Sequence, residues 1–121
     1  MKILLIDDEP LVARVMAEAL QDEGNHVVIA ANGEEGLRMI EESLPDAVFL
    51  DVVMPGMDGI EVLRRIRARS PDLPVIILTG WASERQIAEA RRLGVTDIIF
   101  KPVALKNLSR ALPGVVRPER P

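Results

Sequence analysis

The chain has 121 residues, of which 48% are hydrophobic and 28% charged, and it carries a formal net charge of −4. This length suits one domain that buries most of its apolar surface, and the lack of cysteine excludes a disulfide scaffold, a thiol catalyst and a thiolate metal site. No cluster of Lys and Arg is large enough to follow a phosphate backbone, so we expect no direct contact with nucleic acid.

Five short apolar runs alternate with amphipathic segments along the chain. The first run is too short for a signal peptide and no run approaches the length of a membrane span, so we expect a cytoplasmic protein. The runs are rich in Val, Ile and Leu and almost uninterrupted, which is typical of parallel strands covered on both faces. We therefore predict strands over residues 2–6, 26–30, 47–50, 75–78 and 98–100.

The segments between the runs carry helix start and stop signals. Pro10 suits a first helical turn, and Leu11, Val15 and Ala19 follow at helical spacing before Gly24 offers a stop. Three later segments begin with a polar residue that has Glu or Gln three positions on, which is typical of a capped helix start. These pairs are Asn32 with Glu35, Asp58 with Glu61, and Ser83 with Gln86.

The regular alternation of strand and helix predicts a three-layer α/β domain with a parallel sheet, because right-handed crossovers place helices on both faces. We predict a short fifth helix over residues 104–112, where Pro113 and Gly114 interrupt the pattern. The last residues have no periodicity. The prediction is therefore one domain over residues 1–112 and a tail or linker over residues 113–121.

Charged residues stand at the ends of three predicted strands. Asp7 and Asp8 follow the first strand, Asp51 the third and Lys101 the fifth. In the strand order 2-1-3-4-5 the first and third strands are neighbours, and the carboxyl ends of parallel strands share one edge, so the three carboxylates converge. Like charges that close repel one another unless a cation is present, and hard oxygen ligands suit Mg²⁺. Acidic residues also favour loops at strand ends, but the combination with Asp51 and Lys101 favours a magnesium site.

A carboxylate beside Mg²⁺ can act as a nucleophile toward phosphorus and form an aspartyl phosphate. Transfer of a phosphoryl group needs positioning and neutralisation of its equatorial oxygens. Mg²⁺ and Lys101 can each neutralise part of that charge, and the hydroxyl of Thr79, at the end of the fourth run, can bond a further oxygen. The predicted chemistry is magnesium-dependent phosphoryl transfer.

The chain resembles the receiver domain of two-component response regulators in four motifs, which are IDDEP, FLDVVMPGMDGIEVL, ILTG and FKP. The resemblance implies a flavodoxin-like (βα)5 fold and a signalling switch that is not a conventional enzyme but catalyses its own phosphorylation and dephosphorylation. The phosphoryl group would come from the phosphohistidine of a histidine kinase or phosphotransfer protein. The signal would pass to a downstream protein, to another part of a longer chain, or to a phosphorylation-dependent homodimer.

The resemblance also implies a role for each candidate site residue, by its position in the motifs. The peptide between Lys101 and Pro102 would be cis, as in a tight and specified turn. The implied roles are phosphoacceptor for Asp51; Mg²⁺ ligand for Asp8, Asp51 and the backbone carbonyl of Val53; water-mediated Mg²⁺ contact for Asp7; and contact with the phosphoryl group for Thr79 and Lys101.

One departure from the family pattern bears on the switch, and two apolar residues bear on the lifetime of the phosphoryl group. The family commonly has an aromatic residue three positions before the lysine, where this chain has Ile98. This chain has an aromatic residue two positions later, Phe100, which lies on the same face of the strand as Ile98. We expect a switch that works mainly through Thr79 and the loop and helix after it, with Phe100 as the alternative. Val53 and Trp81, which would flank the phosphoryl group, are apolar and cannot orient water, so we expect slow self-dephosphorylation.

Three other classes fit part of the pattern. A haloacid-dehalogenase-type phosphatase needs a second aspartate two residues after its nucleophile, where this chain has Val53. A flavodoxin needs a hydroxyl- and amide-rich loop after the first strand, where this chain has acidic residues that would repel flavin phosphate. A receiver fold that acts as an interaction module without phosphorylation is the remaining alternative.

Overall fold

The sheet is built from β1 (Lys2–Ile6), β2 (His26–Ala30), β3 (Ala47–Asp51), β4 (Val75–Thr79) and β5 (Asp97–Phe100). The computed structural model describes residues 1–54, 56, 58–100 and 111–112. All strand pairs are parallel and the order is β2-β1-β3-β4-β5, which confirms the prediction. β1 and β2 have the predicted limits, whereas β3 and β4 each extend one residue further. Asp51 and Thr79 are therefore the last residues of their strands.

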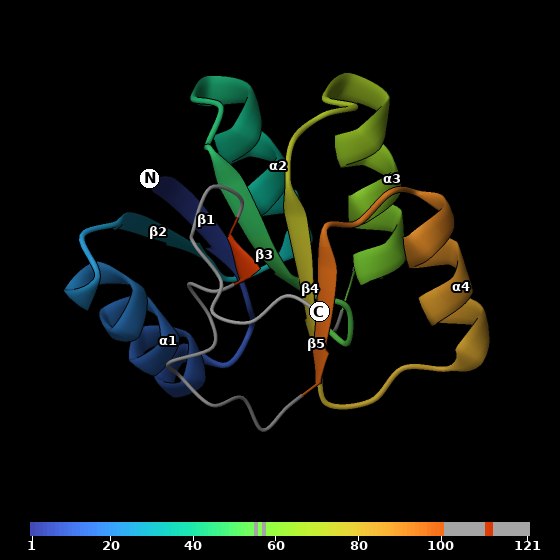
Figure 1. Cartoon of the computed structure of the whole chain (residues 1–121), viewed down its shortest axis with the longest axis horizontal. Coiled ribbons are helices and arrows are strands. Elements are labelled where there is room, and N and C mark those ends of the chain that lie inside the picture. Colours follow the sequence, from blue (N-terminus) through green and yellow to red (C-terminus); the bar gives the residue numbers. More distant parts are fainter. Residues whose placement is uncertain (55, 57, 101–110, 113–121) are drawn as a thin grey trace, which may run out of the picture.

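The described helices are α1 (Pro10–Asp22), α2 (Gly33–Glu42), α3 (Gly59–Arg69) and α4 (Glu84–Arg92). α1 covers one face of the sheet, and α2, α3 and α4 cover the other (Figure 1). The helix predicted over residues 104–112 and the tail predicted over residues 113–121 lie outside the described residues, except for Ala111 and Leu112. None of the helices that the structure describes is long and apolar enough to cross a bilayer.

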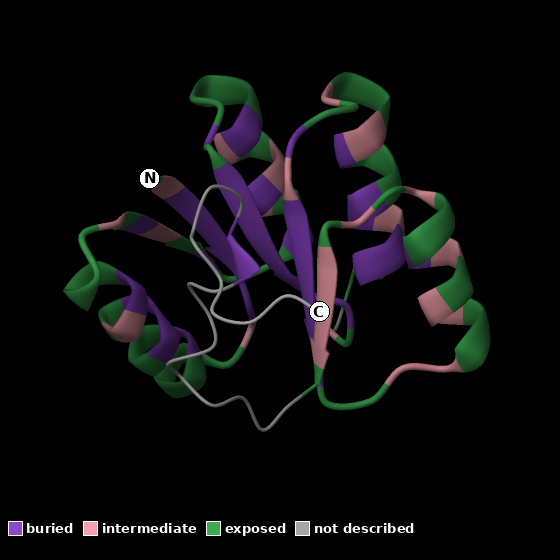
Figure 2. Ribbon diagram, viewed as in Figure 1, coloured by how far each residue is buried: buried purple, intermediate pink, exposed green. Residues whose placement is uncertain are grey.

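The core consists of two apolar layers, one on each face of the sheet. In β3, Val48 and Leu50 pack on the side of α2, α3 and α4, whereas Ala47 and Phe49 pack on the side of α1. Figure 2 shows the central strands buried along their length and β5, at the edge, only partly buried. Because both faces are covered, the positions before Asp51 in β3 and before Thr79 in β4 are all apolar, and the sequence there does not alternate.

The helices begin near the predicted signals. Ser83 starts α4 with a complete capping box, as predicted. Asn32 accepts a 2.8 Å hydrogen bond from the N–H of Glu35 at the start of α2. Asp58 caps α3 by accepting a hydrogen bond from the N–H of Ile60. The predicted pair was Asp58 with Glu61, so the donor is one residue earlier than expected. Each of these bonds satisfies a backbone donor that the first helical turn leaves without a partner in the helix.

α1 has apolar residues on two sides. The side that faces the sheet is not the one that carries Leu11 and Val15, from which the helix was predicted. Both of these residues are exposed, Leu11 by 77%. The sheet instead covers a neighbouring set of smaller and more flexible side chains. These buried residues are Ala13, Met16, Ala17 and Leu20.

Candidate functional site

The carboxyl ends of β1 and β3 bring the predicted acidic residues together. Asp7 directly follows β1, and Asp51 is the last residue of β3. These two strands are hydrogen-bonded neighbours in the sheet. Carboxylate oxygens of Asp7, Asp8, Glu9 and Asp51 all lie within 4.8 Å of one another. Asp7 is 1% exposed and Asp51 is 3% exposed, whereas Glu9 is open to solvent. The convergence predicted from strand order is thus present in the structure.

Backbone N–H groups orient the two buried carboxylates. The N–H of Glu9 donates to Oδ1 of Asp7 at 3.0 Å, and the N–H of Val53 donates to Oδ1 of Asp51 at 2.9 Å. A carboxylate that accepts such bonds is held in one direction, because bonds to an ionised oxygen are among the stronger ones in proteins. The loops after β1 and β3 therefore aim both carboxylates at the same point.

This set of donors suits a hard cation. All four groups are carboxylates, and Mg²⁺ prefers oxygen ligands while it keeps several of its waters. Four negative charges this close together repel one another, and a divalent cation among them reverses the sign of the local interaction. The cluster can therefore hold a metal ion.

Glu9 is not among the ligands predicted from the sequence. It follows Asp8 in the same loop and precedes α1, where its side chain makes no capping hydrogen bond to the helix. Negative charge is favourable at a helix N-terminus, so Glu9 suits this place for two reasons. The signal that points to it is its position directly after Asp8 at a strand end.

Thr79 is fully buried at the end of β4, beside the strand that ends in Asp51. Its hydroxyl oxygen, Oγ1, donates to the carbonyl oxygen of Trp81 at 2.6 Å and accepts from the N–H of Trp81 at 3.2 Å. Trp81 itself is 69% exposed. The hydroxyl is thus at the predicted edge of the sheet and is engaged with the loop that leads to α4.

Of the two other predicted site residues, the structure describes one. Val53 is half-exposed in the loop after β3, and its carbonyl as a Mg²⁺ ligand stays a prediction. Lys101 lies outside the described residues, as does Pro102 with the predicted cis peptide.

The loop between β3 and α3 turns sharply at Gly56, and at Gly59 it lies against the backbone of Asp51 and Val52. Gly56 has φ of 84°, a left-handed conformation that favours glycine. At Gly59 a Cβ atom would lie 2.2 Å from Cα of Val52 and 2.9 Å from the carbonyl oxygen of Asp51. Only glycine allows α3 to start this close to Asp51.

The aromatic residue of β5 lies beside Thr79. Phe100 pairs with Thr79 in the parallel register and is 53% exposed. Ile98 instead packs against the core layer on the side of α2, α3 and α4. Val53, Trp81 and Phe100 therefore form an exposed apolar rim at the carboxyl edge of the sheet.

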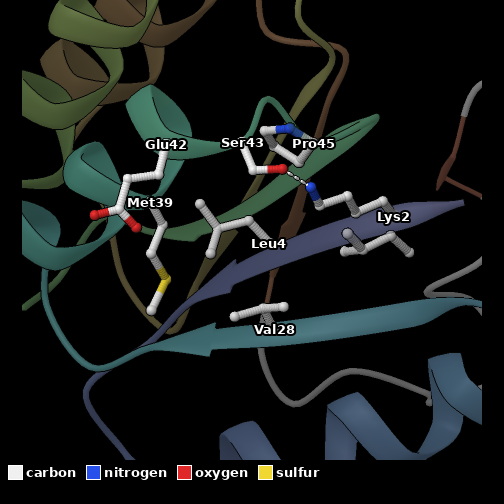
Figure 3. Close-up of a pocket in the computed structure, with 8 residues that line it drawn as sticks. Lys2, Leu4, Val28, Met39, Glu42, Ser43 and Pro45 are labelled. Carbon is white, nitrogen blue, oxygen red and sulfur yellow. Dashed lines mark hydrogen bonds between the residues drawn. The ribbon is translucent and has the colours of Figure 1, made fainter.

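A cavity of about 320 Å³ lies at the opposite, amino end of the strands, between β1, β2 and α2 (Figure 3). Leu4, Val28 and Met39 line it with apolar surface, and Lys2 bonds Ser43 at its rim. It contains none of the predicted site residues.

A family model described as the response regulator receiver domain matches residues 3–113. The chain belongs to this family. The receiver family accounts for the five-stranded parallel sheet and for the acidic cluster at its carboxyl edge together. It also excludes the phosphatase and flavodoxin alternatives.

Among curated relatives, the chain is 37% identical over 115 residues to the transcriptional regulatory protein AfsQ1 of Streptomyces coelicolor, covering 95% of this chain and 51% of that protein. It is 36% identical over 121 residues to the response regulator MprA of Mycobacterium avium, covering 100% of this chain and 53% of that protein. The chain thus spans about half the length of these relatives.

A receiver domain protein from Methanospirillum hungatei, described as CheY-like, has the same fold in its crystal structure. The TM-score is 0.87 at 31% sequence identity, with 90% of this chain and 87% of that chain covered. This agreement extends over nearly the whole receiver fold.

Proposed function

We propose that this receiver domain is a phosphorylation-dependent switch that accepts a phosphoryl group on Asp51 in the presence of Mg²⁺. The observation that carries the proposal is the burial of Asp51 among the carboxylates of Asp7, Asp8 and Glu9, beside Thr79. A nearly buried carboxylate in a cluster of like charge is costly for the fold, and such sites mark function more often than stability.

The donor is the phosphohistidine of a histidine kinase or phosphotransfer protein. A carboxylate oxygen of Asp51 forms the new bond to phosphorus while the bond from phosphorus to the donor's imidazole nitrogen breaks. The electron pair stays on that nitrogen, which takes up a proton from water, and Asp51 becomes an acyl phosphate. Asp8, Asp51 and the carbonyl of Val53 would hold Mg²⁺, with Asp7 acting through water.

When bound, Mg²⁺ supplies positive charge to the oxygens of the transferring group. Lys101 and the hydroxyl of Thr79 would bond further phosphoryl oxygens. Thr79 is buried at the same edge of the sheet, and its hydroxyl already donates to the carbonyl oxygen of Trp81. It has only to redirect this hydrogen bond to a phosphoryl oxygen.

The output passes through protein contact, either with a separate protein, with another part of a longer chain, or within a phosphorylation-dependent homodimer. Residues 1–112 form the switch in this proposal, and residues 113–121 are a tail or linker. The exposed apolar rim of Val53, Trp81 and Phe100 supports a role in contact because it is next to the site that changes.

The test is intact mass after incubation with Mg²⁺ and acetyl phosphate, for the wild type and Asp51→Asn side by side. We expect one added phosphoryl group in the wild type, none in Asp51→Asn, and none after Mg²⁺ is chelated. No adduct in the wild type would instead favour a receiver fold that acts as an interaction module without phosphorylation.

A further inference from the structure

The guanidinium group of Arg67 ties the C-terminal end of α4 to the loop after α3. Its Nε donates to the carbonyl oxygen of Leu93 at 2.7 Å and its Nη2 to that of Gly94 at 2.8 Å. Its Nη1 donates to the carbonyl oxygens of Leu73 at 2.6 Å and Ser70 at 3.2 Å. One side chain thus serves four backbone acceptors from two segments that are twenty residues apart.

Two of these acceptors are carbonyl groups of residues that end helices. Ser70 is the C-cap residue of α3 and Leu93 is the C-cap residue of α4. A cation at a helix C-terminus is favourable, and here one cation serves two such ends. Only the planar fork of an arginine reaches acceptors in several fixed directions, because a lysine ammonium is a single point at the end of a flexible chain.

The C-terminal end of α4 packs against the core, as Ala82 does just before the helix. Of the nine residues of α4, all of them described, only Ala90 is buried. Leu93 and Val95 pack against the core just beyond the helix. The N–H groups of Gly94 and Val95 also return hydrogen bonds to the last turn of α4. The C-terminal end of α4 is therefore held by core contacts, by backbone bonds and by Arg67.

The other end of α4 is held differently. Its N-terminal turn follows the loop 80–83, and that loop contacts the site through the two hydrogen bonds between Thr79 and Trp81. A small cavity of about 10 Å³ lies between α4 and the sheet, lined in part by Thr79, Ala82 and Ile87. The packing beneath the helix is therefore not complete.

We infer that Arg67 is a positioning residue that makes the C-terminal end of α4 a fixed pivot, so that phosphorylation moves only the N-terminal end of the helix. The inference rests on the proposed function, because Thr79 is expected to exchange the carbonyl of Trp81 for a phosphoryl oxygen. Release of that carbonyl frees the loop 80–83, whereas the four bonds of Arg67 are remote from the phosphoryl group and stay in place. The result is a rotation of α4 about one end instead of a displacement of the whole helix.

Residue-resolved amide hydrogen exchange by NMR tests this inference, with the protein kept phosphorylated by excess acetyl phosphate and Mg²⁺. In the wild type, phosphorylation should change exchange at least tenfold in residues 80–86 and less than twofold at Leu93, Gly94 and Val95. In Arg67→Lys and Arg67→Gln the change should extend to those three amides. Arg65→Gln, an exposed arginine on the same helix that pairs with Glu61, is the matched control and should behave as the wild type does.

Intact mass on the same samples separates the two claims, and unchanged exchange in β1 and β3 shows that each variant is folded. If no adduct forms on the wild type, both the proposed function and the pivot are wrong. If the adduct forms and the wild type changes as much at residues 93–95 as at residues 80–86, the pivot alone is wrong. A phosphorylated, folded Arg67→Lys with the wild-type pattern would also overturn it.

Discussion

The hydroxyl group of Thr79 donates its hydrogen bond to the carbonyl oxygen of Trp81, 2.6 Å away and two residues along the chain. A hydroxyl has a single proton to donate. In this state that proton holds the loop after β4, so Thr79 must release Trp81 before it can donate to a phosphoryl oxygen. The two bonds are mutually exclusive, which links the chemistry at Asp51 to the backbone of the loop that leads into α4.

Thr79→Val should separate phosphorylation from its structural consequence. Valine keeps the branched shape of the buried side chain and removes the hydroxyl, so we expect intact mass still to show the phosphoryl group on Asp51. The change in the fluorescence of Trp81, the only tryptophan, should be lost or strongly reduced on phosphorylation. Thr79→Ser restores the donor and should recover the change. A full response in Thr79→Val would contradict the proposed exchange of hydrogen bonds.

Gly59→Ala and Gly36→Ala should differ in the free energy of unfolding. A Cβ at Gly59 would lie 2.2 Å from the backbone of Val52, so we expect a loss of about 3 kcal/mol, at the upper end for overpacking. A Cβ at Gly36 would meet the buried side chain of Ile6 instead of backbone, and the better helix propensity of alanine offsets part of the strain, so we expect a smaller loss, of about 1 to 2 kcal/mol. Urea denaturation measures both, and equal effects would show that the approach to Asp51 is not tight.

Val53→Asn should speed the loss of the phosphoryl group. Val53 is half-exposed next to the buried Asp51, and a carboxamide there can orient a water molecule that valine cannot. We expect dephosphorylation about tenfold faster, which corresponds to a barrier lower by about 1.4 kcal/mol. The decay of the adduct after removal of the phosphodonor measures this rate. Val12→Asn, at a partly exposed position on α1, should decay at the wild-type rate, and an unchanged rate in Val53→Asn would count against this role.

Glu9→Gln should weaken Mg²⁺ binding without abolishing it. Glu9 is exposed, so the loss of its charge beside a divalent cation, at a separation of up to about 4.8 Å, is worth about 1 to 2 kcal/mol, or about five- to thirtyfold in affinity. Titration with Mg²⁺ followed by calorimetry measures the affinity. Glu18→Gln, which removes an exposed carboxylate from α1, is the matched control. Equal affinities of Glu9→Gln and the wild type would remove Glu9 from the site.

Much of the fold could be predicted because the signals are local and agree with one another. Uninterrupted apolar runs predict strands covered on both faces, and the placement of Asp7, Asp8 and Asp51 at the ends of two such runs predicts their convergence once the strand order is fixed. Asp51 and Thr79 proved to be the last residues of their strands instead of the first residues of loops. Their backbones continue the ladder, a feature that composition does not reveal.

The rest depends on contacts between distant segments. α1 carries two apolar stripes, and periodicity alone could not show that Ala13 and Met16 are buried while Leu11 and Val15 are exposed. The four acceptors of Arg67 are carbonyl groups, which have no sequence signal, so this arginine resembles the other arginines of α3 in the sequence. Glu9 was missed for a different reason, because a third acidic residue in a row is also what a solvated loop contains.

The most direct test of the account locates the phosphoryl group itself. Borohydride reduces an acyl phosphate to an alcohol, so a phosphorylated aspartate becomes homoserine, and peptide mass spectrometry identifies its position. After incubation with Mg²⁺ and acetyl phosphate, we expect homoserine at position 51 alone in the wild type and none in Asp51→Asn. Homoserine at position 7 or 8, or its absence from a protein whose intact mass shows a phosphoryl group, would contradict the assignment of Asp51 as the acceptor.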